Sequence, residues 1–494
     1  MRKLIISMTL LLGCASAFAQ QTDKLLQTLK SELNYSMEQL QKQPDHKPYY
    51  MSMRVEDKYT LVLKSSFGNK NGEDEVRTRL FSPQIRIGSK QLDNFKYTTQ
   101  GTQQYQGMSV TQPTMLPLDD NATDGIRAAI WKETNSRYKY ACQAFDEAKT
   151  KAATTAANED KAACFSDAPI EKYYDASIGN RYYQIDKIGW LKKLNEISAA
   201  FKAAPELLSG EASLTYQVSR VYFVNTEGSE VVQNRICGRI MLSTQAVAAD
   251  GMNLPLNKDY LAYDLDSLPS VEKIVTDAKD MVQRVLALRD APVADPYTGP
   301  AMLSGEASGV FFHEIFGHRL EGHRLKEGGE TFKKMVDQLV LPKEFQVYCD
   351  PTLRHYAGTD LNGYYKYDDE GVKARRVNNV VNGVLKSFLM SRVPLDGFPV
   401  SNGHGRTSDD KDPVSRQSNL IVETNKPYTD AQMRQMLRAE AKKQGKEYGY
   451  YFKTVTSGYT YTGEGGSLNS FNVTPLEVYR IFADGRPDQL VRGV

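Results

Sequence analysis

Three of the chain's six histidines fall close together, as His313, His318 and His323, and His313 is followed directly by Glu314. Two imidazoles that share one face of a helix can bind a zinc ion. A carboxylate beside them can take a proton from a water molecule whose pKa the metal lowers to about 7. This group is therefore the first place in the sequence to look for catalytic chemistry.

The spacing of His313 and His318 differs from that of the common metalloprotease motif His-Glu-x-x-His, which places its ligands four residues apart. Here the two histidines are five residues apart. In an ideal α-helix, at about 100° per residue, that separation points the side chains roughly 140° apart. A single π-type turn would return them to one face, and Gly317 would ease the strain. We therefore predict a π-bulge within residues 312–318.

The elements that must position this group are predicted from periodicity. Apolar residues at helical spacing, or polar Ala-rich sequence, predict helices at residues 20–43, 120–159, 190–203 and 270–288. Alternating patterns predict strands at residues 50–54, 59–64, 213–223 and 230–244, with a turn at residues 56–58. Beyond the histidines, strands are predicted at residues 345–349, 377–381, 384–391, 419–423, 449–461 and 476–483. This mixture indicates an α+β fold with antiparallel sheets.

The length of 494 residues favours two domains. Residues 290–300 contain three prolines and are the best linker candidate. We expect a mixed α+β N-terminal domain at residues 20–289 and a β-rich C-terminal domain at residues 301–494, which carries the histidines.

Charge and hydropathy exclude several classes of protein. Sixty-two basic and sixty acidic residues leave a formal net charge of +2, so there is no basic excess for binding nucleic acid. After the first residues, no stretch approaches the ~20 apolar residues that a membrane span needs. We expect neither a nucleic-acid partner nor a membrane span.

The amino terminus is predicted to be a signal peptide of residues 1–19. Arg2 and Lys3 precede an apolar stretch at residues 4–12, and Ala17-Phe18-Ala19 forms a small-residue cleavage site. Lipoprotein anchoring through Cys14 is the alternative, but the apolar stretch before it is short, so we favour cleavage after Ala19. The mature protein is expected in the periplasm or outside the cell. There, Cys142 and Cys164 could form a disulfide, or remain free thiols.

The sequence from residue 309 to 322 resembles the metal-binding helix of the TldD/PmbA peptidases, whose signature is His-Glu-x-x-x-His. The similarity continues through Asp-Asp-Glu-Gly at residues 368–371, Asn-Gly-Val-Leu-Lys at 382–386, Asn-Gly-His-Gly-Arg at 402–406 and Thr-Ser-Gly at 456–458. It covers residues 301–494 well and the first half weakly. The resemblance implies an α+β N-terminal domain, a β-rich catalytic domain and a dimer that encloses a peptide-accessible chamber.

The resemblance also implies roles for particular residues. His313 and His318 would bind one Zn²⁺ per chain, and Glu314 would act as general base. Glu321, one turn beyond His318, is a candidate to support that ligand by hydrogen bonding, with an ordinary surface carboxylate as the alternative. His323 is interpreted as a residue without a role in the chemistry.

One family feature has no counterpart here. The third metal ligand in the family is a cysteine in a Gly-rich segment near the carboxyl terminus, whereas this sequence stops at Val494 without one and Cys349 does not occupy the matching place. We therefore expect a C-terminally truncated chain. The resemblance predicts a zinc-dependent peptidase that acts on peptides or unfolded segments, as a homodimer or a heterodimer with a family member. The alternative is a non-catalytic subunit that binds peptides or completes such a dimer.

Overall fold

The computed structural model describes residues 23–97, 104–105, 108–109, 114–154, 161–326, 330–408, 411–460 and 471–494. The predicted signal peptide, residues 1–19, lies outside these ranges. None of the helices described is long and apolar enough to cross a membrane.

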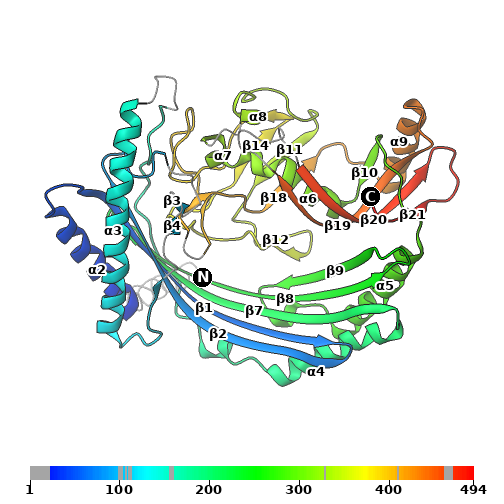
Figure 1. Cartoon of the computed structure of the whole chain (residues 1–494), viewed down its shortest axis with the longest axis horizontal. Coiled ribbons are helices and arrows are strands. Elements are labelled where there is room, and N and C mark those ends of the chain that lie inside the picture. Colours follow the sequence, from blue (N-terminus) through cyan, green and yellow to red (C-terminus); the bar gives the residue numbers. More distant parts are fainter. Residues whose placement is uncertain are drawn as a thin grey trace, which may run out of the picture.

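The first half of the chain is built on one long curved sheet (Figure 1). Its strands are β1 (Pro48–Ser66), β2 (Asn69–Ile87), β5 (Thr114–Met115), β6 (Lys172–Tyr174), β7 (Leu207–Asn225), β8 (Glu230–Val247) and β9 (Asn253–Ala262). They follow the order β5-β2-β1-β7-β8-β6, and β9 also pairs with β8. Among these strand pairs the β6–β8 pair is parallel, and the other pairs are antiparallel.

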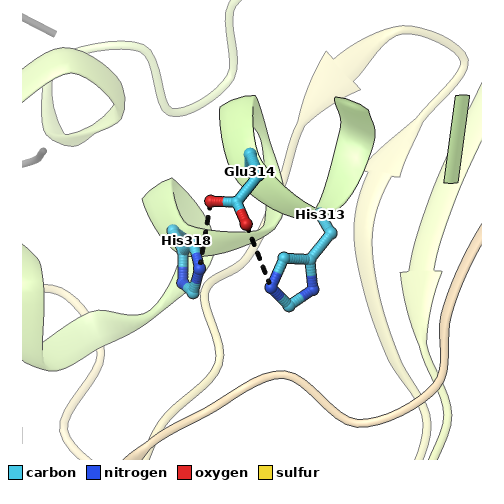
Figure 2. A group of neighbouring side chains, drawn as sticks. All are labelled: His313, Glu314 and His318. Carbon is cyan, nitrogen blue, oxygen red and sulfur yellow. Dashed lines mark ion pairs between the residues drawn. The ribbon is translucent and has the colours of Figure 1, made fainter. Parts of the chain in front are cut away.

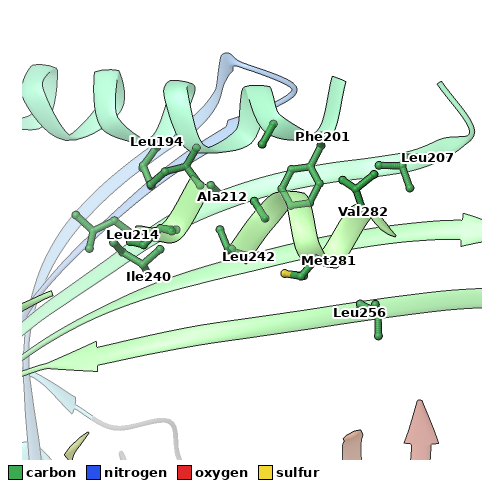
Figure 3. Packing of buried hydrophobic residues seen from close by; sticks show 14 of the residues in the cluster. Leu194, Phe201, Leu207, Ala212, Leu214, Ile240, Leu242, Leu256, Met281 and Val282 are labelled. Carbon is green, nitrogen blue, oxygen red and sulfur yellow. The ribbon is translucent and has the colours of Figure 1, made fainter. Parts of the chain in front are cut away.

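Helices cover one face of this sheet. They are α2 (Lys24–Gln41), α3 (Thr123–Thr154), α4 (Lys187–Ala199) and α5 (Val271–Asp290). The largest core cluster fills the space between α4, α5 and the sheet (Figure 3). In this cluster Phe201 lies in the 3₁₀ turn η2 (Ala200–Ala203), Met281 in α5, and Leu242 in β8. Burying such side chains stabilises the layer by roughly 1.5–3 kcal/mol each.

The opposite face of the sheet meets the second half of the chain. Alternate residues of a strand point to opposite faces, and on β7 Tyr216 joins the helix-side core while Phe223 packs with Tyr367 from the second half. Figure 1 shows this arrangement, with α4 on one side of the sheet and the later strands on the other.

The second half contains two small sheets. One has the order β10-β19-β20-β21, from β10 (Ala301–Leu303), β19 (Tyr448–Thr460), β20 (Phe471–Phe482) and β21 (Gln489–Val491). The other has the order β15-β14-β11-β18, from β11 (Phe345–Cys349), β14 (Val377–Val381), β15 (Val384–Leu385) and β18 (Leu420–Thr424). The helices of the second half are α6 (Gly305–Ile315), α7 (Gly322–Lys326), α8 (Glu330–Lys333) and α9 (Asp430–Lys443). Short elements complete the description of both halves. The first half also contains β3 (Gln104–Tyr105), β4 (Met108–Ser109), η1 (Asn180–Tyr183) and η3 (Leu265–Ser267). The second half also contains η4 (Gly317–Leu320), β12 (His355–Tyr356), β13 (Thr359–Asp360), β16 (Gly405–Arg406) and β17 (Val414–Ser415).

The predicted α+β class is confirmed, but two local predictions are wrong and one helix was not predicted. The turn at residues 56–58 does not exist, because β1 continues through it and Asp57 accepts hydrogen bonds from Arg77 (2.8 Å) and Arg79 (3.0 Å) on β2. The strand predicted at 384–391 stops at Leu385. Helix α9 was not predicted, although Thr429 and Gln432 form a capping box at its start.

Candidate metal centre

Helix α6 carries the first part of the histidine group and is fixed at its start. Ser304 caps the helix, because its hydroxyl oxygen accepts a hydrogen bond from the backbone N–H of Ala307 at 3.0 Å. The same hydroxyl donates to the carbonyl oxygen of Lys453 on β19 at 2.7 Å. The helix is therefore attached to the strand that runs beside it.

The chain changes direction between His313 and His318. Helix α6 ends at Ile315 and the 3₁₀ turn η4 follows, with Phe316 between them at φ −113° and ψ −55°. The predicted π-bulge is wrong: the N–H of Arg319 donates to the carbonyl of Phe316 at 3.0 Å, which is a 3₁₀ pattern. Phe316 and Leu320 are both buried in the core cluster of this half, and this packing holds the break in the helix.

Gly317 lies directly against the side chain of Gln417 at this break. A Cβ atom at this position would lie 1.9 Å from Oε1 of Gln417. The amide of Gln417 also lies 3.4 Å from both the carbonyl oxygen of His313 and Nδ1 of His318. A side chain at residue 317 would therefore displace a residue that contacts both histidines.

The break brings the two imidazoles together, as Figure 2 shows. Their ring centroids are 4.7 Å apart and their planes meet at 77°. The Glu314 carboxylate lies between them, 3.9 Å from Nε2 of His313 and 3.6 Å from Nε2 of His318. One ligand atom from each of the three residues lies within 4.8 Å of the others. Two imidazoles and a carboxylate are the donor types that zinc binds, so the residues present suit a divalent metal ion.

The Glu314 side chain is held by β19. The Thr460 hydroxyl lies 2.6 Å from the carbonyl oxygen of Glu314 and 3.1 Å from its Oε2. Gly458 packs against the same side chain, and a Cβ atom there would lie 2.7 Å from Cγ of Glu314. The carboxylate is buried and has little freedom to leave the two histidines.

Glu321 is fully buried beneath His318. Its Oε2 lies 3.1 Å from Nδ1 of His318 and accepts from Nε of Arg324 at 2.6 Å, and its Oε1 lies 3.2 Å from Nε of Arg416. Burial would raise the pKa of this carboxyl group, but the hydrogen bond with His318 and the charges of the two arginines lower that pKa to about 2. An ionised carboxylate therefore orients the His318 ring and leaves its Nε2 on the side of Glu314.

His313 differs from His318 in exposure. About half of its side chain (47%) is open to solvent, against 10% for His318. Partial burial, and then the charge of His318, lower the pKa of His313 below its usual value. A neutral imidazole at neutral pH is the form that can bind a metal.

The other histidines stand apart from this group. His323 and His404 are buried, and burial lowers the pKa of each to about 4. His404 contacts the carbonyl oxygen of Asn402 and the hydroxyl of Ser418, which is a structural role. His46 pairs with Asp146, and His355 pairs with Asp360.

The cysteines of the described chain are free thiols at Cys142, Cys164, Cys237 and Cys349. Cys164 is buried and its thiol lies 3.2 Å from the carbonyl oxygen of Gln91. Of the two possibilities for Cys142 and Cys164, the structure contains the free thiols.

The contacts that distant segments make with the histidine group were not predicted from the sequence. Thr460 and Gly458 reach the site from β19, and Gln417 and Arg416 reach it from the segment before β18. The Thr-Ser-Gly motif at residues 456–458 was the one signal that pointed to β19.

The histidine group lies in a part of the chain that is similar to known proteins. A family model described as the PmbA/TldA metallopeptidase C-terminal domain matches residues 296–491. A metalloprotease of Archaeoglobus fulgidus is 32% identical over 124 residues, which are 25% of this chain and 28% of that protein. A metalloprotease of Methanothermobacter thermautotrophicus is 26% identical over 207 residues, which are 40% of this chain and 43% of that protein. The matches thus span less than half the length of these curated relatives.

Solved structures share the whole fold. TldE from Thermococcus kodakarensis superposes with a TM-score of 0.60 at 14% identity, covering 94% of this chain and 90% of that one. A chain from Bacteroides thetaiotaomicron gives a TM-score of 0.59 at 12% identity, covering 95% and 90%. The histidine-bearing half of the chain therefore carries a C-terminal domain of the TldD/PmbA type, at residues 296–491. The fold of the whole chain is similar to that of TldE.

Proposed function

We propose that this protein hydrolyses peptides or unfolded segments of proteins, with a zinc ion held by His313 and His318 and with Glu314 as general base. The observation that carries the proposal is the convergence of these three side chains, whose ligand atoms lie within 4.8 Å of one another. The metalloprotease names of the relatives support the same class of reaction.

The histidines would hold the metal through nitrogen atoms that face Glu314. Because Glu321 contacts Nδ1 of His318, the opposite nitrogen Nε2 is free for a ligand. A zinc ion bound there would supply a Lewis acid that polarises a carbonyl group and lowers the pKa of water.

Glu314 would move the proton. Its carboxylate lies within 4 Å of Nε2 of both histidines and can accept a proton from an attacking water molecule. It can then deliver that proton to the nitrogen of the departing amine. The Thr460 hydroxyl, 3.1 Å from Oε2, restricts the orientation of the carboxylate during both transfers.

The test is the Glu314→Gln variant, assayed with an unfolded peptide substrate after its zinc content has been matched to that of the wild type. We expect turnover to fall by roughly 10²–10⁴-fold, because the amide cannot accept the proton. Glu306→Gln, on the same helix, is the control and should keep its activity. Unchanged turnover in the Glu314 variant at full zinc occupancy would refute the mechanism.

Export through residues 1–19 and assembly into a homodimer or a family heterodimer belong to the same proposal. Amino-terminal sequencing of the mature protein should begin at Gln20. Light scattering on the purified protein should give a dimer mass, and a monomer that retains full peptidase activity would contradict the assembly.

A further inference from the structure

Two buried carboxyl groups, those of Asp368 and Glu370, lie where the two halves of the chain meet. Asp368 is 1% exposed and Glu370 is 4% exposed. The adjoining Gly371 lies against the first half, because a Cβ atom at this glycine would be 2.5 Å from Cε1 of Phe223 on β7. Neither carboxyl group belongs to the histidine group. They are therefore part of the junction between the two halves.

The arginines around these two groups already have carboxylates of their own. The ion pairs, at 2.6–3.2 Å, are Arg392 with Glu227, Arg86 with Asp93, Arg54 with Glu56, Arg406 with Asp369, and Arg137 with Glu133. The phenol groups of Tyr50 and Tyr365 are neutral, because burial raises the pKa of each. Within the part of the chain that the structure describes, no cation forms an ion pair with Asp368 or Glu370. A negative charge on either group is therefore not offset by a cation of its own.

The two carboxyl groups differ in their hydrogen-bond donors. Asp368 accepts from three backbone N–H groups, those of Glu370 at 3.0 Å, Val372 at 2.8 Å and Gly405 at 2.9 Å. Glu370 accepts from one, the N–H of Arg392, which lies 2.6 Å from Oε2. Hydrogen bonds donated to a carboxylate favour its charged form. Asp368 is therefore the better site for a negative charge, and Glu370 is the better site for a proton.

A cavity of about 30 Å³ lies beside Glu370, between the two halves. Lys411 and Asp412, of opposite charge, form part of its wall. Two buried atoms of residues in this wall have no hydrogen-bond partner among the described residues, namely Oε1 of Glu370 and Nη2 of Arg137 on α3. Buried polar groups are almost always paired, by protein or by ordered water. The cavity has room for a water molecule, which needs about 10–15 Å³ of such volume and can both accept and donate hydrogen bonds.

The pH range of ionisation follows from this burial. Burial raises the pKa of Glu370 to about 7, and the N–H and charge of Arg392 offset only part of the effect. Burial, and then the charge of Glu370, raise the pKa of Asp368 as well, so the two groups together hold at least one proton below pH 7. The folded-state pKa of Glu370 lies above the value of about 4.3 in an unfolded chain. Its stabilising effect is therefore fully present below about pH 4 and is lost as the pH rises through 7.

We propose that Glu370 is a proton-binding site that controls how firmly the two halves of the chain are joined. In mildly acidic solution its carboxyl group is neutral, and Oε1 donates its proton to water in the cavity. At higher pH the ionised group adds a buried negative charge beside Asp368 and favours opening of the junction. The junction includes the guanidinium of Arg392, which donates to Glu227 and to the carbonyl oxygen of Ser166 in the first half. The switch does not depend on the proposed peptidase function.

Infrared spectroscopy of the purified protein detects this proton directly, because a protonated carboxyl group absorbs apart from carboxylates and amides. We expect the wild type to lose a carboxylic-acid band between pH 5 and pH 9, with a midpoint near pH 7. The Glu370→Gln variant should lack this band at pH 5, and Asp368→Asn should keep it. Glu477→Gln is the matched control and should also keep the band, because it removes a buried carboxylate that is ionised by its pairing with Arg284.

Hydrogen–deuterium exchange measures the opening of the junction. After correction for the intrinsic effect of pH, peptides that cover residues 366–374 and 388–393 should exchange about tenfold faster at pH 8 than at pH 6 in the wild type. Glu370→Gln is neutral at every pH and should exchange at the same corrected rate at both. A peptide from α5, in the helix-side core, is the internal reference and should show no such difference.

Three results would overturn the proposal. The first is a wild-type spectrum without loss of a carboxylic-acid band between pH 5 and pH 9, which needs no variant. The second is a band that persists in Glu370→Gln and disappears in Asp368→Asn, because the proton would then belong to Asp368. The third is the same pH dependence of exchange in Glu370→Gln as in the wild type.

Discussion

Thr460 and Glu314 are 146 residues apart in the sequence, yet the Thr460 hydroxyl lies 2.6 Å from the carbonyl oxygen of Glu314 and 3.1 Å from its Oε2. The contact joins the end of β19 to the last turn of α6. It fixes both the backbone and the carboxylate of the residue proposed as general base.

Removing this hydroxyl tests its positioning role. We expect Thr460→Val to lower kcat for peptide hydrolysis about tenfold, because a carboxylate that is no longer restrained spends less time in the reactive orientation. Zinc affinity and KM should stay close to the wild-type values. Thr460→Ser, which retains the hydroxyl, should recover most of the rate. Equal loss in the serine and valine variants would show that packing, and not the hydrogen bond, is what matters.

Glu321 is expected to control metal affinity through His318. The Glu321→Gln variant removes the charge that faces Nδ1 of His318, Arg324 and Arg416. Loss of such a partner typically weakens metal binding by about 10–100-fold. Competition titration with a zinc chelator measures this change. Glu344→Gln, a control outside the histidine group, should bind zinc as the wild type does, and an unchanged affinity in Glu321→Gln would exclude the supporting role.

The sequence allowed the histidine group to be predicted, because His313, Glu314 and His318 are local in the chain and their residue types are specific for metal chemistry. The π-bulge was wrong because an isolated helix was considered. In the folded protein, Phe316 and Leu320 enter one hydrophobic cluster, and the helix breaks into a 3₁₀ turn to allow this. The prediction that the two imidazoles converge was therefore correct, but a 3₁₀ turn brings them together and not a π-bulge.

Contacts between distant segments could not be predicted in this way. Thr460 faces Glu314 because β19 runs beside α6, and that pairing follows from the register of the whole small sheet. Similarly, Asp57 looked like a turn residue until β2 supplied Arg77 and Arg79 opposite it. In such cases the partner residues on the neighbouring strand decide the backbone structure, and not the local preference for a turn.

The acid stability of the first half should depend on Asp277. This carboxylate accepts hydrogen bonds from Lys273 and the Tyr260 hydroxyl, each at 2.6 Å, and lies 3.1 Å from Nζ of Lys258. Burial would raise its pKa, but these partners lower the pKa to about 2. The folded-state pKa thus lies below the value of about 3.9 in an unfolded chain. The stabilisation is therefore present above about pH 4 and is lost as the pH falls toward 2.

Urea unfolding of Asp277→Asn, compared with wild type between pH 5 and pH 2, measures this contribution. The difference in unfolding free energy should be largest at pH 5 and should shrink as the pH approaches 2. Asp280→Asn, an exposed change on the same helix, is the control and should show little pH-dependent difference. A constant difference between Asp277→Asn and wild type across this range would contradict the assignment.

The zinc content of the purified protein tests the central claim most directly, namely that His313 and His318 share one metal ion. We predict about one zinc ion per wild-type chain after dialysis against zinc and removal of the excess. His313→Ala and His318→Ala should each lose most of that metal, while His46→Ala, whose ring pairs with Asp146 elsewhere, should keep it. A wild-type protein without bound zinc, or full zinc occupancy in both site variants, would contradict the account.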